Sequence, residues 1–272
     1  MKNQKQSLMV LAAITAVVVA AIMLFVWPGL LLEGVSGPNA PRSTPTAHGD
    51  FTYVTIEEKD PDTDDVTRTV TITEYHGNGV HAVVPAMLGG APVTAIGEGA
   101  FARSVKLTEI TLPAGVTVLG EGAFEDCTAL QTVHLSSALT EIGERAFRFC
   151  SSLTEVEIPE GVETIGDMAF FDCTALTEAK LPESLTRIGK DAFASCVRLE
   201  TVNLPEGLLE IGDGAFRKCM ALGALTLPGG DLTIGENVFL ECPNLVLDVP
   251  AGSPAETYCL KNDLIPAPTP AP

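Results

Sequence analysis

The sequence is poor in the residues from which most catalytic and metal centres are built. It has only 4 histidines among 272 residues, and these stand apart from one another at His48, His76, His81 and His134. No spacing among them would bring two imidazoles to a pair of thiolates, as zinc requires. A Ser-His-Asp order, a phosphate-cradling glycine loop and a nucleotide fingerprint are also missing. The sequence therefore predicts no catalytic residue, no metal ion, no cofactor and no enzymatic activity.

Positive charge is scarce as well, with 16 Lys and Arg against 35 Asp and Glu. Lys2 and Lys5 precede an uncharged N-terminal stretch, so the chain beyond that stretch carries 14 − 35 = −21. Such a surface repels nucleic acid and anionic lipid heads. The acidity fits either the solubility of an exported domain or the recognition of a cationic partner or calcium. The dependence of binding on ionic strength would separate these two interpretations.

A calcium loop is present only superficially. Asp60, Asp62 and Asp64 have the acidic spacing of such a loop. However, Asp65 stands where its glycine belongs and Thr71 where its bidentate glutamate belongs. We interpret this segment as an ordinary polar hairpin turn.

The N-terminal segment lacks ionisable residues from Leu8 to Leu32. An apolar run of about 18 residues is long enough to span a bilayer, and this run exceeds the roughly 7 to 15 apolar residues of a signal peptide. Because no convincing small-x-small cleavage site follows it, we favour an uncleaved membrane anchor over a cleaved signal sequence. Lys2 and Lys5 precede the span, so the positive-inside rule places the N-terminus in the cytoplasm and the remaining chain outside the cell.

Aromatic residues make up only 6% of the chain, yet its phenylalanines recur at a constant spacing of 23 residues. The repeated positions are Phe101, Phe124, Phe147, Phe170, Phe193, Phe216 and Phe239. The whole unit reads LxxVxIPxxVxxIGxxAFxxCxx. Self-similarity at about 20 to 29 residues with alternating Leu and Ile is typical of a leucine-rich-repeat solenoid, whose units bury their apolar faces only by stacking.

Each unit is predicted to contain a strand, a turn, a second strand and a short helical or 3₁₀ segment, which gives a mostly β or repeating α/β solenoid. In the unit that begins at Leu153, Pro159 ends the first strand because proline cannot donate to the ladder. Gly166 turns the chain, and Asp167 precedes Met-Ala-Phe, where a carboxylate can cap a first helical turn. Parallel strand pairing should join neighbouring coils about 4.8 Å apart.

Residues 83–259 resemble the BspA-like leucine-rich repeat family, through the recurrent IG(E/D)xAFxxC motif, the LP between strands and the segment 71–101 that leads into the repeats. The resemblance implies a bacterial or protist surface protein without enzymatic activity, and several members of the family look like adhesins for host or matrix components. Three positions depart from the pattern. Ser136 replaces the strand-ending proline, Ser104 the first cysteine and Asp231 an apolar strand residue, which weakens individual coils.

The composition of the flanking segments predicts caps and a linker around the repeats. An alternating hairpin should cover the first coil, because a solenoid end exposes strand edges and core. Ser253 can begin a short closing helix. The predicted segments are, in order, the cytoplasmic N-terminus 1–7, the anchor or signal sequence 8–32, the linker 33–50, the β cap and first coil 51–95, the solenoid 96–250, the C-terminal cap 251–264 and the proline-rich tail 265–272.

Six of the 7 cysteines occupy one repeat position, at Cys127, Cys150, Cys173, Cys196, Cys219 and Cys242. Adjacent rungs lie within the Cα separation that a disulfide permits, but parallel side chains would hold their Cβ atoms one strand spacing apart, farther than the usual distance of about 3.8 Å. Export permits oxidation, whereas cysteine is also a good small buried apolar residue. We favour buried thiols and leave disulfides as the alternative.

Recognition, if it is specific, should use the outward side chains of the first strand of each coil, which align into a polar face. The candidate binding residues are Glu109, Thr111, Thr132, His134, Glu155, Glu157, Glu178, Lys180, Thr201 and Asn203. This stripe almost lacks aromatic residues, whereas binding hot spots favour Trp, Tyr and Arg, so a merely solvated face is the plainer interpretation of any single position. The helical edge offers a second candidate patch, made of Arg148, Phe149, Phe171, Arg198, Arg217 and Lys218.

Two hypotheses follow from these features. The first is a membrane-anchored binding or adhesion module that engages an extracellular protein or glycan. The second is a structural envelope component that serves as a spacer or self-associates without a dedicated ligand. The shortage of aromatic residues favours the second, and the family resemblance favours the first.

Overall fold

The computed structural model describes residues 45–264 of the chain. These residues belong to one compact unit, 43–272. The predicted anchor 8–32, the proline-rich tail and most of the predicted linker lie outside the described residues. Between residues 45 and 264, no helix has the length and apolar character needed to cross a membrane.

The first part of the described chain is an antiparallel β cap formed by β1 (Thr46–His48), β2 (Phe51–Lys59) and β3 (Val66–Tyr75). Because β1 pairs with β2, the last residues of the predicted linker belong to this cap. In the β2–β3 turn, the Asp60 carboxylate accepts hydrogen bonds from the backbone N–H groups of Asp62 and Thr63, at 2.8 and 3.0 Å. These bonds lower the pKa of Asp60 and make the acidic segment a hairpin turn.

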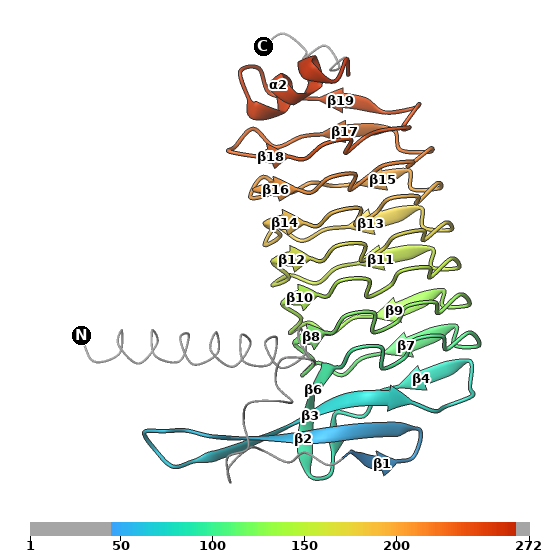
Figure 1. Ribbon diagram of the computed structural model, residues 1–272, viewed down its shortest axis with the longest axis vertical. Coiled ribbons are helices and arrows are strands. Elements are labelled where there is room, and N and C mark those ends of the chain that lie inside the picture. Colours follow the sequence, from blue (N-terminus) through green and yellow to red (C-terminus); the bar gives the residue numbers. More distant parts are fainter. Residues whose placement is uncertain (1–44, 265–272) are drawn as a thin grey trace, which may run out of the picture. The chain divides into compact units, whose positions relative to one another are not determined.

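After the cap, each coil contributes one strand to each of two parallel ladders (Figure 1). The first ladder contains β4 (His81–Val83), β7 (Glu109–Thr111), β9 (Thr132–His134), β11 (Glu155–Glu157), β13 (Glu178–Lys180), β15 (Thr201–Val202), β17 (Ala224–Thr226) and β19 (Val246–Asp248). The second contains β6 (Ala91–Ile96), β8 (Val118–Leu119), β10 (Glu141–Ile142), β12 (Thr164–Ile165), β14 (Arg187–Ile188), β16 (Glu210–Ile211) and β18 (Thr233–Ile234), and β5 (Met87–Leu88) pairs with β6. The predicted leucine-rich-repeat solenoid with parallel ladders is confirmed.

The two ladders differ in continuity. The second ladder runs without a break from β3 to β18, whereas the first is divided into three sheets, β4-β7-β9, β11-β13-β15 and β17-β19. At the first break, the bond from Thr154 N to Gln131 O is stretched to 3.5 Å. At the second, the Asn203 side chain binds the backbone of Leu181, accepting from its N–H at 2.9 Å and donating to its C=O at 2.8 Å. A side chain thus takes the place of the next ladder bonds.

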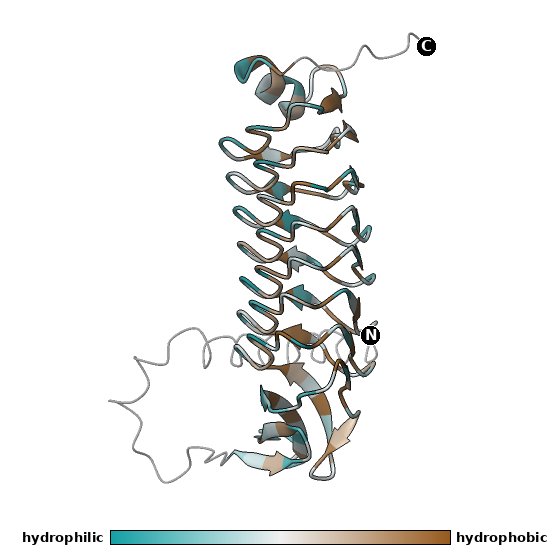
Figure 2. Ribbon diagram, turned by 90° about the vertical axis from the view of Figure 1, so that its right-hand side faces the viewer, coloured by the Kyte–Doolittle hydropathy of each residue, from teal (hydrophilic) through white to brown (hydrophobic). Residues whose placement is uncertain are grey.

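The core is a stack of phenylalanine rings that follows the repeat. Successive rings from Phe101 to Phe239 lie 5.0 to 5.8 Å apart between centroids and are nearly parallel. Tyrosines from the caps close the stack at both ends, Tyr75 at 4.8 Å from Phe101 and Tyr258 at 6.3 Å from Phe239. Figure 2 shows hydrophobic and hydrophilic residues alternating around the coils. Each phenyl ring is therefore buried between its two neighbours, which explains the strict spacing in the sequence.

The predicted helical or 3₁₀ segment of each coil is wrong: within residues 45–264 the only helix is α2 (Pro254–Lys261). The segment around each Phe is a turn in which alternate N–H groups point in different directions. Phe101 N donates to Ala123 O of the next coil at 2.8 Å, whereas Ala102 N donates back to Gly99 O at 2.9 Å. Half of the N–H groups thus bind the neighbouring coil, which a helix, with all its bonds internal, would not allow.

This alternation requires two left-handed residues in every coil. The first such position is Gly99, Gly122, Arg145, Met168, Asp191, Gly214 and Asn237 in successive coils, with φ between 52° and 64°. Residues with a Cβ are strained in this conformation, by about 1–2 kcal/mol. Four coils therefore carry a strain that glycine avoids in the other three.

We expect Met168→Gly to raise the free energy of unfolding by about 1 kcal/mol, because glycine adopts a φ of 56° without strain. Urea denaturation of residues 43–272, followed by circular dichroism, measures the change. Gly99→Ala is the matched reverse variant, since its Cβ would meet nothing closer than Ala102 Cβ at 3.9 Å; it should lose a similar amount. Equal stability of Met168→Gly and the parent would contradict the expectation.

The glycine that follows the second strand has a different role from the one predicted. It turns no corner through positive φ; instead, it lets two coils approach closely. A Cβ on Gly166 would lie 2.6 Å from Glu144 N and 2.7 Å from Gly143 C in the preceding coil, and a Cβ on Gly189 2.6 Å from Asp167 N. Real Cβ atoms do not come so near to backbone. The glycine ladder therefore sets how tightly the coils stack.

At the C-terminal end, α2 closes the solenoid. Ser253 caps this helix by accepting from Glu256 N at 3.1 Å, and Pro254 occupies its first turn. Ala255 and Cys259 on its inner face are buried. The end of the core is thereby shielded from water.

Candidate binding face

The ten predicted binding residues lie on adjacent strands from β7 to β15, or directly after β15 in the case of Asn203. The strand register places Glu109 beside Thr132, Thr111 beside His134, Glu155 beside Glu178 and Thr201, and Glu157 beside Lys180. Glu109, Thr111 and Glu178 are half-buried, and the other seven are exposed. We call the outward side of these strands the strand face. It spans two of the three sheets of the first ladder.

Sequence spacing missed the N-terminal end of the strand face. His81 and Val83 on β4 pair with Glu109 and Thr111 on β7, and Val83 is 70% exposed. The offset from His81 to Glu109 is 28 residues instead of 23, because the first coil is irregular. Extending the ladder backwards through a predicted parallel pair would have been the only signal in the sequence.

Two histidines that looked unrelated in the sequence meet on one carboxylate of this face. His81 Nδ1 lies 3.0 Å from Glu109 Oε2, and His134 Nε2 lies 3.1 Å from Glu109 Oε1. Both oxygens of Glu109 therefore have partners within the chain. Across residues 45–264, no three His, Cys, Asp or Glu residues are grouped so that they could hold a metal ion.

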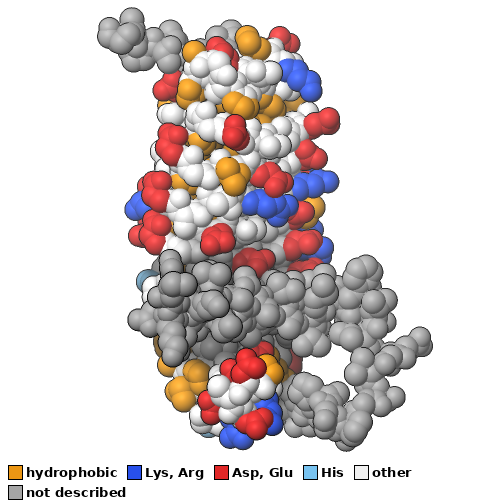
Figure 3. Space-filling view, turned by 90° about the vertical axis from the view of Figure 1, so that its left-hand side faces the viewer, with side chains coloured by type: hydrophobic (Ala, Val, Ile, Leu, Met, Phe, Trp, Pro, Cys, Tyr) orange, Lys and Arg blue, Asp and Glu red, His pale blue; other side chains and the backbone are white. Residues whose placement is uncertain are grey.

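The middle of the strand face is acidic and open. Glu155, Glu157 and Glu178 form no ion pair with any residue in the described part of the chain, although Lys180 is the register partner of Glu157. Acidic side chains also dominate the charged groups on the side drawn in Figure 3. Because these carboxylates are exposed and unpaired, they can meet an external cation without first breaking an internal contact.

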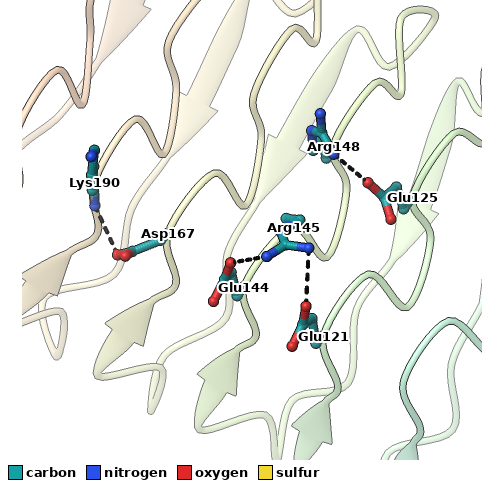
Figure 4. Close-up of polar contacts among 7 residues, drawn as sticks. All are labelled: Glu121, Glu125, Glu144, Arg145, Arg148, Asp167 and Lys190. Carbon is teal, nitrogen blue, oxygen red and sulfur yellow. Dashed lines mark hydrogen bonds and ion pairs between the residues drawn. The ribbon is translucent and has the colours of Figure 1, made fainter. Parts of the chain in front are cut away.

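Most of the second candidate patch is held by contacts inside the chain (Figure 4). Arg148 Nη1 lies 2.7 Å from Glu125 Oε1, and its guanidinium carbon lies 4.3 Å from the centroid of Phe149. The Phe149 and Phe171 rings meet edge to face at 5.9 Å. This half of the patch therefore stiffens the turn edge, the row of turns that carry the Phe ladder.

The same edge contains further internal ion pairs. Arg145 lies 3.2 Å from Glu121 and 2.6 Å from Glu144 (Figure 4). Burial raises the pKa of Glu121, and Arg145 opposes that rise. Arg217 lies 2.9 Å from Asp191. By contrast, Arg198 and Lys218 form no ion pair within residues 45–264.

Asp167 does not cap a helix, contrary to the prediction. Its Oδ1 accepts a hydrogen bond from the backbone N–H of Lys190, one coil further on, at 2.9 Å (Figure 4). Asp213 binds the N–H of Glu236 in the same way at 2.7 Å. A carboxylate at this position therefore joins two coils, which is possible because the turn directs alternate N–H groups out of its own coil.

The cysteine ladder consists of free thiols. Each Sγ donates to the carbonyl oxygen of the Phe in the preceding coil, as from Cys150 to Phe124 at 3.2 Å and from Cys196 to Phe170 at 3.1 Å. Burial raises the pKa of every ladder thiol, to about 12 for Cys127 and about 11 for Cys242. The thiols are thus protonated structural donors rather than nucleophiles.

Comparison with known proteins places these features in a group. A sequence profile of the BspA type leucine rich repeat region matches residues 91–196 and 140–251, with six copies. A leucine-rich repeat protein of T. pallidum has a crystal structure similar to 82% of this chain and 100% of its own, with 31% identity and a TM-score of 0.65. No curated protein matches the chain.

A second solved structure adds a location. The leucine-rich cell surface protein of Faecalibacterium prausnitzii A2-165 is similar over 78% of this chain, with 32% identity and a TM-score of 0.65. The present chain spans 56% of that protein. The solenoid is therefore shared with a bacterial protein that is described as a surface protein.

Proposed function

The chain belongs to the BspA-type leucine-rich repeat family, and on that premise we propose that it is a cell-surface binding module that recognises an extracellular protein or glycan through its strand face. The observation that carries the proposal is the row of exposed carboxylates without internal partners, Glu155, Glu157 and Glu178, on a rigid parallel ladder. The similarity to a bacterial cell surface protein supports the location.

The chemistry of the face favours a cationic ligand. Three carboxylates on adjacent strands, flanked by threonine hydroxyls at Thr132 and Thr201, offer acceptors for ammonium or guanidinium groups. A basic segment of a protein or an amino sugar has such groups. We expect the affinity to fall with salt, because exposed charges are screened over about 8–10 Å.

The same proposal includes attachment to the membrane. The uncharged segment 8–32 would anchor the chain, with residues 1–7 in the cytoplasm and the solenoid outside; cleavage of that segment would release a secreted form. We propose no catalytic role.

A second candidate function is a structural spacer or self-association scaffold of the cell envelope. It is favoured by the composition of the strand face, in which none of the ten predicted residues is a Phe, Tyr or Trp. Aromatic side chains supply much of the energy at binding hot spots.

A binding screen distinguishes the two functions. Soluble residues 34–272 are presented to a panel of glycans and matrix proteins, and we expect saturable binding to at least one of them. Replacing Glu109, Glu155 and Glu178 with Lys should weaken that binding by about a hundredfold, since each lost charge contact contributes about 1 kcal/mol.

The matched control changes the same amount of charge elsewhere, by Glu160→Lys, Glu183→Lys and Glu206→Lys, all outside the strand face. This variant should keep the affinity of the parent. Binding that is equally reduced in both variants would mean that net charge alone attracts the ligand. Self-association without any saturable ligand would favour the scaffold and contradict the binding module.

A further inference from the structure

A surface on the turn edge near the C-terminal end combines unpaired cations with exposed apolar side chains. Its members are Val197, Arg198, Lys218, Met220 and Leu240, and we call it the basic edge patch. Val197, Met220 and Leu240 are 37%, 44% and 47% exposed. Lys218 N donates to Leu240 O at 2.8 Å, so residues of consecutive coils lie side by side. Arg198 and Lys218 have no carboxylate partner within residues 45–264, unlike the other arginines of this edge.

A different corner of the same coils has the opposite charge. Glu160, Glu183 and Glu206 follow the strand-ending prolines of three consecutive coils, and all three are exposed. The Glu160 Oε1 atom accepts from Glu183 N at 3.3 Å, but none of the three forms an ion pair in the described part of the chain. Leu209 beside them is 55% exposed. We call this surface the proline corner.

We propose that the basic edge patch of one copy packs against the proline corner of a second copy, so that the solenoids lie side by side. The two surfaces complement each other in charge and in exposed apolar side chains: Arg198 and Lys218 would meet Glu183 and Glu206. Exposed charges of one sign that have no internal partner gain most from such a contact, because no existing ion pair is broken.

The spacing of the charges favours a second copy over an unrelated partner. Both surfaces repeat with the rise of the coil, which the Phe stack sets at 5.1 Å between Phe170 and Phe193 and at 5.4 Å between Phe193 and Phe216. A neighbour with the same rise keeps every charge opposite its partner from coil to coil. A surface with another spacing would lose this match after one or two coils.

One chain cannot satisfy both surfaces by itself. Within each coil the first strand precedes the proline corner and the second strand follows it, so the second strand separates this corner from the turn edge. The contact therefore joins unlike surfaces of two chains. Such a heterologous contact leaves one free surface on each outer copy and extends into rows unless a ring closes.

Sedimentation velocity of the full chain in a density-matched detergent tests the proposal. At about 50 mM NaCl the parent should form species larger than a monomer, and at about 500 mM NaCl the association should weaken about tenfold or more, because screening shortens to a few Å. Arg198→Glu with Lys218→Glu should abolish the association, and so should Glu183→Lys with Glu206→Lys.

The decisive sample is an equimolar mixture of these two double variants. Each keeps one parental surface, and their altered surfaces are again opposite in charge, so the mixture should associate as the parent does. Lys180→Glu with Lys261→Glu makes the same change in net charge away from both surfaces and should leave association unchanged. Association through any segment outside the solenoid would be equal in all variants.

A monomeric parent at about 100 µM and low salt would overturn the proposal, as would a mixture in which the two variants stay apart. Loss of binding to phosphatidylserine vesicles on Arg198→Glu with Lys218→Glu, without a change in protein mass, would assign the basic edge patch to a lipid surface instead. The strand-face variants with Lys at Glu109, Glu155 and Glu178 should associate normally, so failure here and failure of the ligand screen can be told apart.

Discussion

Gly166→Ala is expected to lower the free energy of unfolding by about 3 kcal/mol or more, although it adds a single methyl group. The new Cβ would lie 2.6 Å from Glu144 N and 2.9 Å from Glu144 Cα. These are backbone atoms of a coil that parallel strand bonds hold in place, so no side chain can rotate away. Overpacking in side-chain cores costs about 1–3 kcal/mol, and here the coils themselves must separate.

Urea unfolding of residues 43–272, followed by circular dichroism, measures this loss. Gly207→Ala is the control, because its Cβ would meet only Glu183 O at 3.5 Å, an ordinary contact. We expect that control to change stability by no more than about 0.5 kcal/mol. A loss for Gly166→Ala no larger than the loss for Gly207→Ala would show that the coils can move apart, and the close approach would then not determine stability.

Alkaline pH should destabilise the solenoid through its buried thiols. The cause is mainly burial, which raises the pKa of Cys127 from 9.0 to about 12 and the pKa of Cys173 in the same direction. The unfolded chain releases these protons near pH 9, whereas the folded chain retains them. Stability is therefore fully present below pH 9 and is lost as the pH rises from 9 toward 12, by about 1.4 kcal/mol per thiol for each pH unit.

Urea unfolding under reducing conditions at about pH 8 and about pH 10.5 measures the effect, and Cys173→Ala isolates one thiol. That variant should lose about 2 kcal/mol less than the parent between the two pH values, from the 1.5 units above the unfolded pKa. Tyr75 and Tyr258, whose pKa values are also raised by burial, are present in both proteins and cancel. An equal loss in both proteins would contradict the assignment to the thiol.

The periodic part of the fold was readable from the sequence because each coil repeats the same burial. Phe170, Cys173 and Ile165 recur since every coil packs them against the same neighbours, and the register of the ladders follows from that period. The conformation between Gly166 and Cys173 was not readable. Its apolar spacing fits a helix, but bonds to the next coil decide the backbone there, and no pattern within one unit reports a partner 23 residues away.

The candidate site was readable only as a set of outward positions. Their alignment follows from strand register, as for Glu155 and Glu178. Which charges are neutralised depends on side-chain reach between coils, and the sequence does not contain that information. Arg148 and Arg198 look equivalent in the sequence, yet Arg148 is paired with Glu125 and stacked on Phe149, whereas Arg198 has no ion pair within residues 45–264.

The unequal continuity of the two ladders has a mechanical consequence. A load that bends the solenoid toward the second ladder compresses one unbroken hydrogen-bonded sheet from β3 to β18. A load that opens the opposite side acts on three short sheets and meets little resistance between β9 and β11 or between β15 and β17. The molecule should flex as a segmented strip with two compliant joints and one stiff back, so its curvature can adapt to a ligand laid along the strand face while its length stays constant.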